Sequence, residues 1–138
     1  DMKKLIAEKY YDEKAGMFRS YIGEKTYTEF GNALCLSIGL GGEDLAEKIT
    51  HGKALKATLA AAAYVYDALL SFGKKYEDYV INEIDENYKK MLDAGATSFW
   101  ETVEGVEDGD LSCSLCHGWS ALPIYYYALT GRIKFSKE

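Results

Sequence analysis

Apolar and charged residues alternate along the chain in blocks of helical length. The block from Asp1 to Tyr10 has apolar residues at helical spacing and predicts a short amphipathic helix. Met17 to Tyr27 is expected to be extended or looped, with at most a short hairpin. Thr26 and Glu29 have capping-box spacing, which would start a second helix whose apolar positions are Phe30, Ala33, Leu34, Leu36 and Ile38.

The same alternation of charged and apolar helices is predicted twice more. Glu43 to His51 is short and charged, whereas Lys53 to Phe72 is rich in alanine and almost free of charge. Tyr76 to Asp93 has an amphipathic pattern, and Ser114 to Thr130 contains no Lys, Arg, Asp or Glu. Pro123 lies within this last segment, so we expect its helix to begin late or to be kinked.

Three helical pairs are therefore expected, each joining a charged helix to one that is apolar on nearly all sides. A helix that is apolar all round must be covered by other helices on every face. Inner helices surrounded by outer ones meet this requirement, as in an α/α toroid. We predict an all-α fold in one domain, residues 1–138. Because exposed inner helices would form a large apolar patch, we also expect self-association.

The composition narrows the classes of function. The 138 residues carry a net charge of -6, which argues against nucleic-acid binding because phosphates are neutralised by clustered Lys and Arg. The longest nearly uncharged run, Leu55 to Phe72, contains Lys56 and Asp67, so we interpret it as a buried helix and expect no membrane partner.

The cellular location is expected to be cytoplasmic. Three cysteines give no disulfide framework, which favours a reducing compartment. The sequence opens with no recognisable signal peptide. Because the first residue is Asp1 and not Met, we expect the chain to be processed, trimmed or part of a longer protein.

Candidate chemistry is concentrated between Gly95 and Trp119. Trp100 and Trp119 are the two tryptophans of the chain, and His117 is one of its two histidines. Glu101 directly follows an aromatic pair. The acids that follow it are interpreted as a solvated charge run with no assigned role: Glu104, Glu107, Asp108 and Asp110.

This region resembles the six-hairpin glycosidases, and specifically the bacterial α-L-rhamnosidases of glycoside hydrolase family 78. The resemblance rests on the segments Gly95–Thr102, with its Ala-Thr-x-x-Trp-Glu element, and Cys116–Ile124, where a histidine precedes an apolar helix. A looser match covers Phe30–Leu34 and Tyr88–Leu92. It extends over most of this chain but only over the C-terminal half of the family's catalytic barrel.

The resemblance implies a specific fold and activity. The fold would be part of an (α/α)6 toroid, about three of its helical hairpins, and the reaction would be inverting hydrolysis of terminal α-L-rhamnosides without a cofactor. Glu101 would be the general base, and Trp100, His117 and Trp119 would line the sugar pocket. The family's general acid lies earlier in the barrel, outside this chain, so we expect the chain alone to be inactive.

The same residues also allow readings without catalysis. Glu101 could be the first member of a solvated acidic loop, the tryptophans could be core residues, and His117 could be a satisfied, partly buried histidine. The alternative function is a helical binding or assembly domain. Such a domain would use the apolar inner helices to pair with another chain.

One further motif suggests a cofactor or a metal. Cys113, Cys116 and His117 have the C-x-x-C-H spacing of c-type haem attachment, but this attachment takes place outside the cytoplasm and no export signal is recognised. A zinc site would need a fourth ligand, and the remaining cysteine, Cys35, is expected on a buried helix. We therefore expect neither cofactor nor metal.

Overall fold

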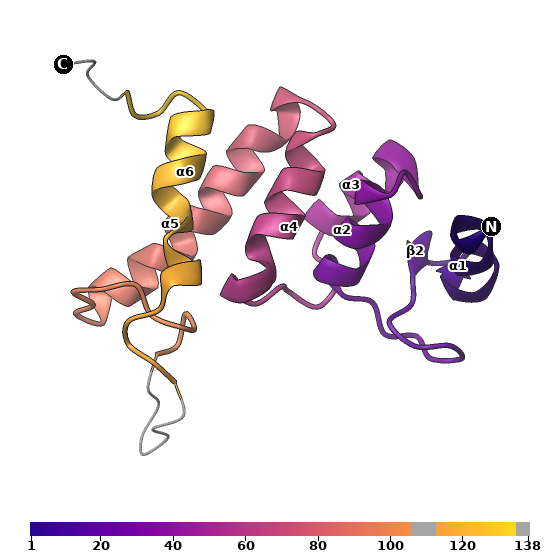
Figure 1. Ribbon diagram of the computed structural model, residues 1–138, viewed down its shortest axis with the longest axis horizontal. Helices are drawn as coiled ribbons and strands as arrows, with labels where there is room; N and C mark the ends of the chain where they lie inside the picture. The colour runs from indigo at the N-terminus through magenta and orange to yellow at the C-terminus, as the bar shows by residue number, and fades with distance from the viewer. Residues whose placement is uncertain (106–112, 135–138) are drawn as a thin grey trace. The chain divides into compact units, whose positions relative to one another are not determined.

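The computed structural model describes residues 1–105 and 113–134. The chain divides into two compact units, Asp1–Tyr76 and Glu77–Glu138, here called the N-terminal and the C-terminal unit. Both units are built from helices, which confirms the predicted all-α class (Figure 1). The organisation as a single domain stays a prediction.

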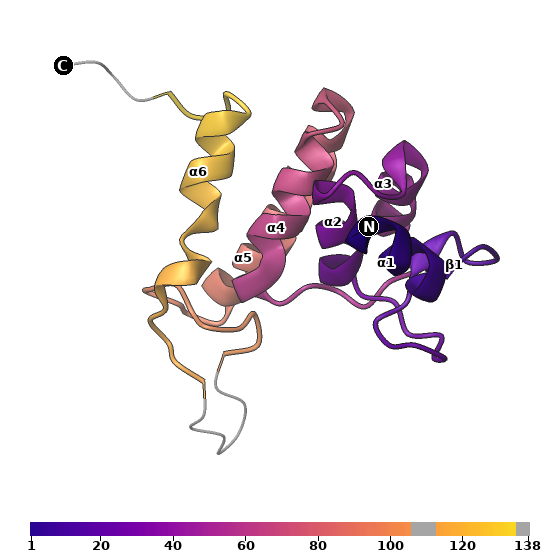
Figure 2. The same cartoon turned by 45° about the vertical axis from the view of Figure 1, so that its right-hand side comes forward.

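The N-terminal unit begins with a helix and a small hairpin. Helix α1 (Met2–Tyr10) is capped by Asp1, whose side chain accepts a hydrogen bond from the backbone N–H of Lys3, and it leads directly into the hairpin (Figure 2). Strand β1 (Tyr11–Asp12) pairs antiparallel with β2 (Met17–Phe18). The hairpin therefore starts earlier than the segment in which the sequence predicted it.

Three helices and a short 3₁₀ turn complete this unit. Helix α2 (Glu29–Ser37) contacts both α3 (Gly42–Thr50) and α4 (Leu59–Leu70), and the three lie side by side in both views (Figures 1 and 2). The 3₁₀ turn η1 (Lys74–Tyr76) packs against α4. Their shared core consists of apolar side chains, including Ala33, Leu36, Leu45, Ile49, Val65 and Leu69.

The predicted start of α2 was wrong in its cap. The N-cap is Thr28, whose hydroxyl accepts a hydrogen bond from the N–H of Gly31 at 3.1 Å, and not Thr26. Glu29 does not turn back to complete a capping box. Its carboxylate instead makes a tertiary contact, in which it accepts a hydrogen bond from the N–H of Ala57 at 3.0 Å.

In the C-terminal unit, the described residues include two α-helices joined by a long connection. Helix α5 (Glu77–Asp93) contacts α6 (Leu122–Leu129), which follows the 3₁₀ turn η2 (Gly118–Ser120). Pro123 lies in the first turn of α6, so the helix begins late. A late start was one of the two outcomes that the sequence predicted. Residues 113–117 are not helical.

Apolar side chains remain exposed on all three apolar helices. Leu34 on α2, Tyr64 on α4 and Ile124 on α6 are each exposed. Self-association through these helices stays a prediction. Among the residues that the structure describes, no helix combines the length and the apolar character needed to span a membrane.

Candidate functional site

The candidate site lies on the connection between α5 and α6, within the C-terminal unit. Gly95 follows α5 with a φ of 87°, a left-handed conformation that lets the chain turn away from the helix. Residues around Phe99 then run beside residues around Ser114. The N–H of His117 donates to the carbonyl of Phe99 at 2.7 Å, and the N–H of Glu101 donates to the carbonyl of Ser114 at 2.8 Å.

This pairing fixes the carboxylate of Glu101. Its Oε2 accepts a hydrogen bond from the backbone N–H of Ser114 at 2.8 Å, and the residue is half-buried. The backbone carbonyl of Glu101 accepts a hydrogen bond from the indole N–H of Trp119 at 3.4 Å. One predicted site residue is thereby joined to another by a direct contact.

His117 and Trp119 form a stacked pair next to Glu101. Their ring centroids are 3.5 Å apart and the rings are inclined by 23°. Within the described part of the chain, His117 Nδ1 is buried and has no hydrogen-bond partner. An unpaired buried polar atom costs about 1–3 kcal/mol, so a hydrogen bond to this nitrogen would stabilise the site.

Trp100 is held in place through its backbone, whereas the prediction concerned its side chain. Its carbonyl accepts a hydrogen bond from the hydroxyl of Ser120, which is fully buried, and the carbonyl of Ser120 accepts one from Tyr88 on α5. The ring of Trp100 lies against Gly105, where a Cβ atom would approach Cε3 of the indole to 2.5 Å. Only glycine therefore fits at position 105 without moving the ring.

Two tyrosines of this unit titrate unusually. Burial raises the pKa of Tyr88 to about 12. Burial also raises the pKa of Tyr127 to about 12, with a further contribution from its hydrogen bond to Asp85. Both phenols remain neutral donors at physiological pH.

An apolar hollow of about 370 Å³ lies beside the candidate site, within the same unit. Met91, Phe99 and Pro123 are among the residues that line it, and the ring of Phe99 meets Tyr88 edge-on at a centroid distance of 6.1 Å. None of the four predicted site residues lines this hollow.

The remaining acids and cysteines of the connection differ in their exposure. Glu104 is exposed, while Glu107, Asp108 and Asp110 lie outside the described residues. Cys116 is exposed and Cys113 is half-buried. Across residues 1–105 and 113–134, no group of three or more His, Cys, Asp or Glu side chains is arranged to hold a metal ion.

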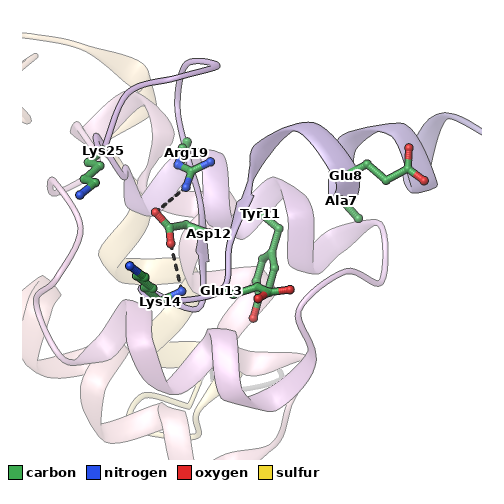
Figure 3. A pocket seen from close by; sticks show the side chains of 8 residues that line it. All are labelled: Ala7, Glu8, Tyr11, Asp12, Glu13, Lys14, Arg19 and Lys25. Atoms are coloured by element: carbon green, nitrogen blue, oxygen red, sulfur yellow. Dashed lines mark hydrogen bonds and ion pairs between the residues drawn. The ribbon is translucent and has the colours of Figure 1, made fainter.

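A second hollow, of about 500 Å³, lies in the N-terminal unit and was not anticipated from the sequence (Figure 3). Asp12 and Arg19 point toward one another in its wall, with Arg19 Nη2 2.7 Å from Asp12 Oδ2 (Figure 3). Tyr27 donates to the same oxygen at 2.8 Å. Because these groups satisfy each other, we interpret the cluster as a fastening of the hairpin.

Sequence reasoning also missed two buried polar residues of α2. Glu29 is 4% exposed and forms an ion pair with Lys56 at 3.3 Å. Asn32 is fully buried; its Oδ1 accepts from the N–H of Phe18 at 2.8 Å, and its Nδ2 donates to the carbonyl of Phe18 at 3.1 Å. Apart from Ser37 at its last position, the other residues of α2 are apolar or glycine, and this contrast was the signal that could have marked both.

Comparison with known proteins identifies a similar fold but assigns no family. No family model and no curated protein matches the sequence. A solved structure, a rhamnosidase from Klebsiella oxytoca with rhamnose bound, matches with a TM-score of 0.73 at 19% sequence identity. The match covers 94% of this chain and 27% of that chain, so this chain spans about a quarter of its length. At this identity the likeness shows a rhamnosidase-like fold and nothing finer.

Proposed function

We propose that this chain forms part of the catalytic region of a glycoside hydrolase that cleaves terminal α-L-rhamnosides with inversion. The observation that carries the proposal is the contact between Glu101 and the stacked His117–Trp119 pair, because the indole N–H of Trp119 donates to the backbone carbonyl of Glu101 while Ser114 holds its carboxylate. The rhamnosidase-like fold supports the choice of reaction class.

Glu101 is assigned the role of general base. In an inverting reaction one carboxylate removes a proton from water, and the water attacks the anomeric carbon from the face opposite to the leaving group. The N–H of Ser114 holds one oxygen of Glu101. Among the described residues it is the only hydrogen-bond donor to this carboxylate, so the other oxygen is left to bind the water.

The aromatic residues are assigned to binding the sugar. Trp119 is 43% exposed and can stack on the C–H face of a pyranose, as electron-rich aromatic faces do. His117, stacked on it, is assigned to hydrogen-bond a sugar hydroxyl or the attacking water; its Nδ1 is buried and lacks a partner among the described residues, so the ring must turn to make this bond. Trp100 would support the pocket wall beside Glu101.

The second carboxyl group is expected to come from outside this chain. An inverting enzyme needs a general acid about 6.5–9.5 Å from the base to protonate the leaving oxygen. We assign no such acid among the described residues, and we therefore expect the chain alone to bind rhamnose but not to hydrolyse rhamnosides.

The test replaces the matching quarter of the Klebsiella oxytoca rhamnosidase with this chain and assays hydrolysis of an aryl α-L-rhamnoside. Glu101→Gln keeps the acceptor for the Ser114 N–H but cannot take a proton, so kcat should fall by about 10²–10⁴-fold while KM changes little. The control is Glu104→Gln, at an exposed acid of the same loop. Unchanged turnover in Glu101→Gln would remove the assignment of the base.

A binding experiment on the 138-residue chain separates catalysis from recognition. L-rhamnose should change the tryptophan emission, and His117→Ala together with Trp119→Ala should abolish that change. The alternative, a helical assembly domain, is favoured by the exposed apolar residues Leu34, Tyr64 and Ile124. It would be supported by a stable oligomer that shows no response to rhamnose.

A further inference from the structure

We propose that Cys113 and Cys116 form a reversible intramolecular disulfide, which makes the segment holding Glu101 a site of redox modification. The two cysteines bracket Ser114, the residue that hydrogen-bonds to Glu101 through both its N–H and its carbonyl. His117 follows Cys116 directly. This inference goes beyond the proposed function, because formation of the bond requires no sugar.

The backbone between the two cysteines already forms a tight turn. The hydroxyl of Ser114 accepts a hydrogen bond from the N–H of Cys116 at 3.2 Å and lies 3.0 Å from the carbonyl oxygen of Cys116, to which it can donate. This turn spans Ser114 to Cys116 and lies between the two cysteines, where it changes the direction of the chain. Disulfides span Cα separations of about 4.4–6.8 Å, a range that two residues with a tight turn between them can reach.

The environments of the two thiols differ in a way that sets their order of reaction. Cys116 is exposed and can meet a disulfide reagent directly. Cys113 is half-buried, and its Sγ lies 3.8 Å from the hydroxyl of Thr102. Cys116 is therefore the attacking thiol, and Cys113 is the one that resolves the intermediate.

Cys35 provides an internal control within the same chain. It is half-buried on α2 in the N-terminal unit, and burial raises the pKa of its thiol to about 11. Because the thiolate is the nucleophile, Cys35 should remain reduced under conditions that oxidise the exposed pair.

The reaction is a two-electron exchange with a low-molecular-weight disulfide such as oxidised glutathione. The Cys116 thiol loses its proton and its sulfur attacks one sulfur of the reagent, which forms a mixed disulfide and releases one glutathione thiolate. The Cys113 thiolate then attacks the Cys116 sulfur and releases the second glutathione. Two protein thiols are oxidised, one glutathione disulfide is reduced to two thiols, and the two protons end on the released glutathione.

Closing the bridge would change the candidate site. Cys113 must leave Thr102, which lies next to Glu101, and turn toward Cys116. Both neighbours of the bridge, Ser114 and His117, belong to the pairing that positions Glu101. We expect oxidation to shift the emission of Trp119 through its stacking partner His117 and to be reversed by dithiothreitol.

The experiment equilibrates the full chain with glutathione buffers of increasing oxidised fraction and then alkylates the free thiols. We expect loss of alkylation at Cys113 and Cys116 together, an internally linked peptide by mass spectrometry, and unchanged alkylation of Cys35. Cys35→Ser should behave like the unmodified sequence. Cys113→Ser should accumulate the mixed disulfide on Cys116, because the resolving thiol is gone.

Three outcomes would overturn the proposal: both cysteines remaining alkylated in fully oxidised glutathione, separate glutathione adducts without an internal link, or linkage between two chains. None of these readouts depends on hydrolysis or on sugar binding. Mass spectrometry of the alkylated peptides tests whether the disulfide forms, whereas the rhamnose titration tests the proposed glycosidase function. The two proposals can therefore fail independently.

Discussion

Glu101 and Ser114 are hydrogen-bonded to each other twice, once through the Glu101 N–H and the Ser114 carbonyl and once through the Ser114 N–H and the Glu101 carboxylate, both at 2.8 Å. The first bond fixes the backbone of Glu101, and the second fixes its side chain. A glutamate held through its backbone and through one carboxylate oxygen is pre-positioned, which a general base requires and which a residue of a solvated loop does not. The arrangement therefore favours the proposed catalytic reading of Glu101.

The contribution of this contact can be separated from that of the serine side chain. Ser114→Pro removes the N–H that holds the carboxylate, whereas Ser114→Ala keeps it. In the hybrid rhamnosidase we expect Ser114→Pro to lower kcat/KM on the order of 100-fold, because a misplaced base loses its geometry. Ser114→Ala should retain most of the activity. Equal losses in the two variants would show that the hydroxyl turn, and not the N–H, positions Glu101.

Gly105 tests whether the position of the Trp100 ring matters. Gly105→Ala places a methyl group against the indole in a backbone with a φ of 66°, so it adds a clash to backbone strain. Gly95→Ala is the matched control, because its φ is 87° and no atom lies within 4 Å of the added Cβ. We expect about 1–2 kcal/mol of lost stability in the control from strain alone.

Gly105→Ala should lose a further 1–3 kcal/mol, roughly, from overpacking, and it should also change the tryptophan emission. Urea unfolding and fluorescence spectra of both variants measure the two effects. If both variants have the same unfolding free energy and the same spectrum, Trp100 is free to move and does not need Gly105.

The sequence predicted the helices well because their signals are local. Pro123 predicted that the last helix begins late or is kinked, and α6 begins late. The amphipathic pattern of Tyr76 to Asp93 predicted a helix with one apolar face, and in α5 the buried residues of that face include Val80, Ile84 and Met91. The cap of α2 was assigned to Thr26 because Thr26 and Glu29 fit a local motif. In the fold Glu29 instead bonds to Ala57, 28 positions away, which no local pattern encodes.

The candidate site was predicted as residues but not as an arrangement. Glu101, His117 and Trp119 were recognised because their types and order resemble a known family. The partner that fixes Glu101 was not, because Ser114 acts through its backbone N–H, which every residue except proline possesses. Ser120 and Tyr88 were missed for a similar reason, since a buried serine within an apolar segment gives no sequence signal.

Asn32 is expected to be essential for the hairpin of the N-terminal unit. Its side-chain amide satisfies both the N–H and the carbonyl of Phe18, in addition to the carbonyl of Thr28 at 2.9 Å. Asn32→Ala leaves the buried N–H of Phe18 unpaired, at a cost of about 1–3 kcal/mol. Ser37→Ala, at an exposed position of the same helix, should change stability by less than about 0.5 kcal/mol. Similar unfolding midpoints in urea for the two variants would contradict this role.

The Asp12 cluster makes the stability of the N-terminal unit depend on pH in the acid range. Hydrogen bonds from Arg19, and then from Tyr27, hold the pKa of Asp12 well below its ordinary value of 3.8. A group whose folded pKa is depressed stabilises the fold fully above its unfolded pKa. That contribution is lost as the pH falls below 3.8 toward the folded pKa.

Asp12→Asn removes the titrating group but keeps its size, so the variant should be less stable at neutral pH and should lose less stability on acidification. Glu13→Gln, at the adjacent exposed acid, is the control and should keep the full decline. Urea unfolding followed by far-UV circular dichroism between about pH 5 and about pH 2 compares the three proteins. If the free energy of unfolding of Asp12→Asn falls with pH as steeply as that of the unmodified chain, the acid sensitivity belongs to other carboxylates and not to Asp12.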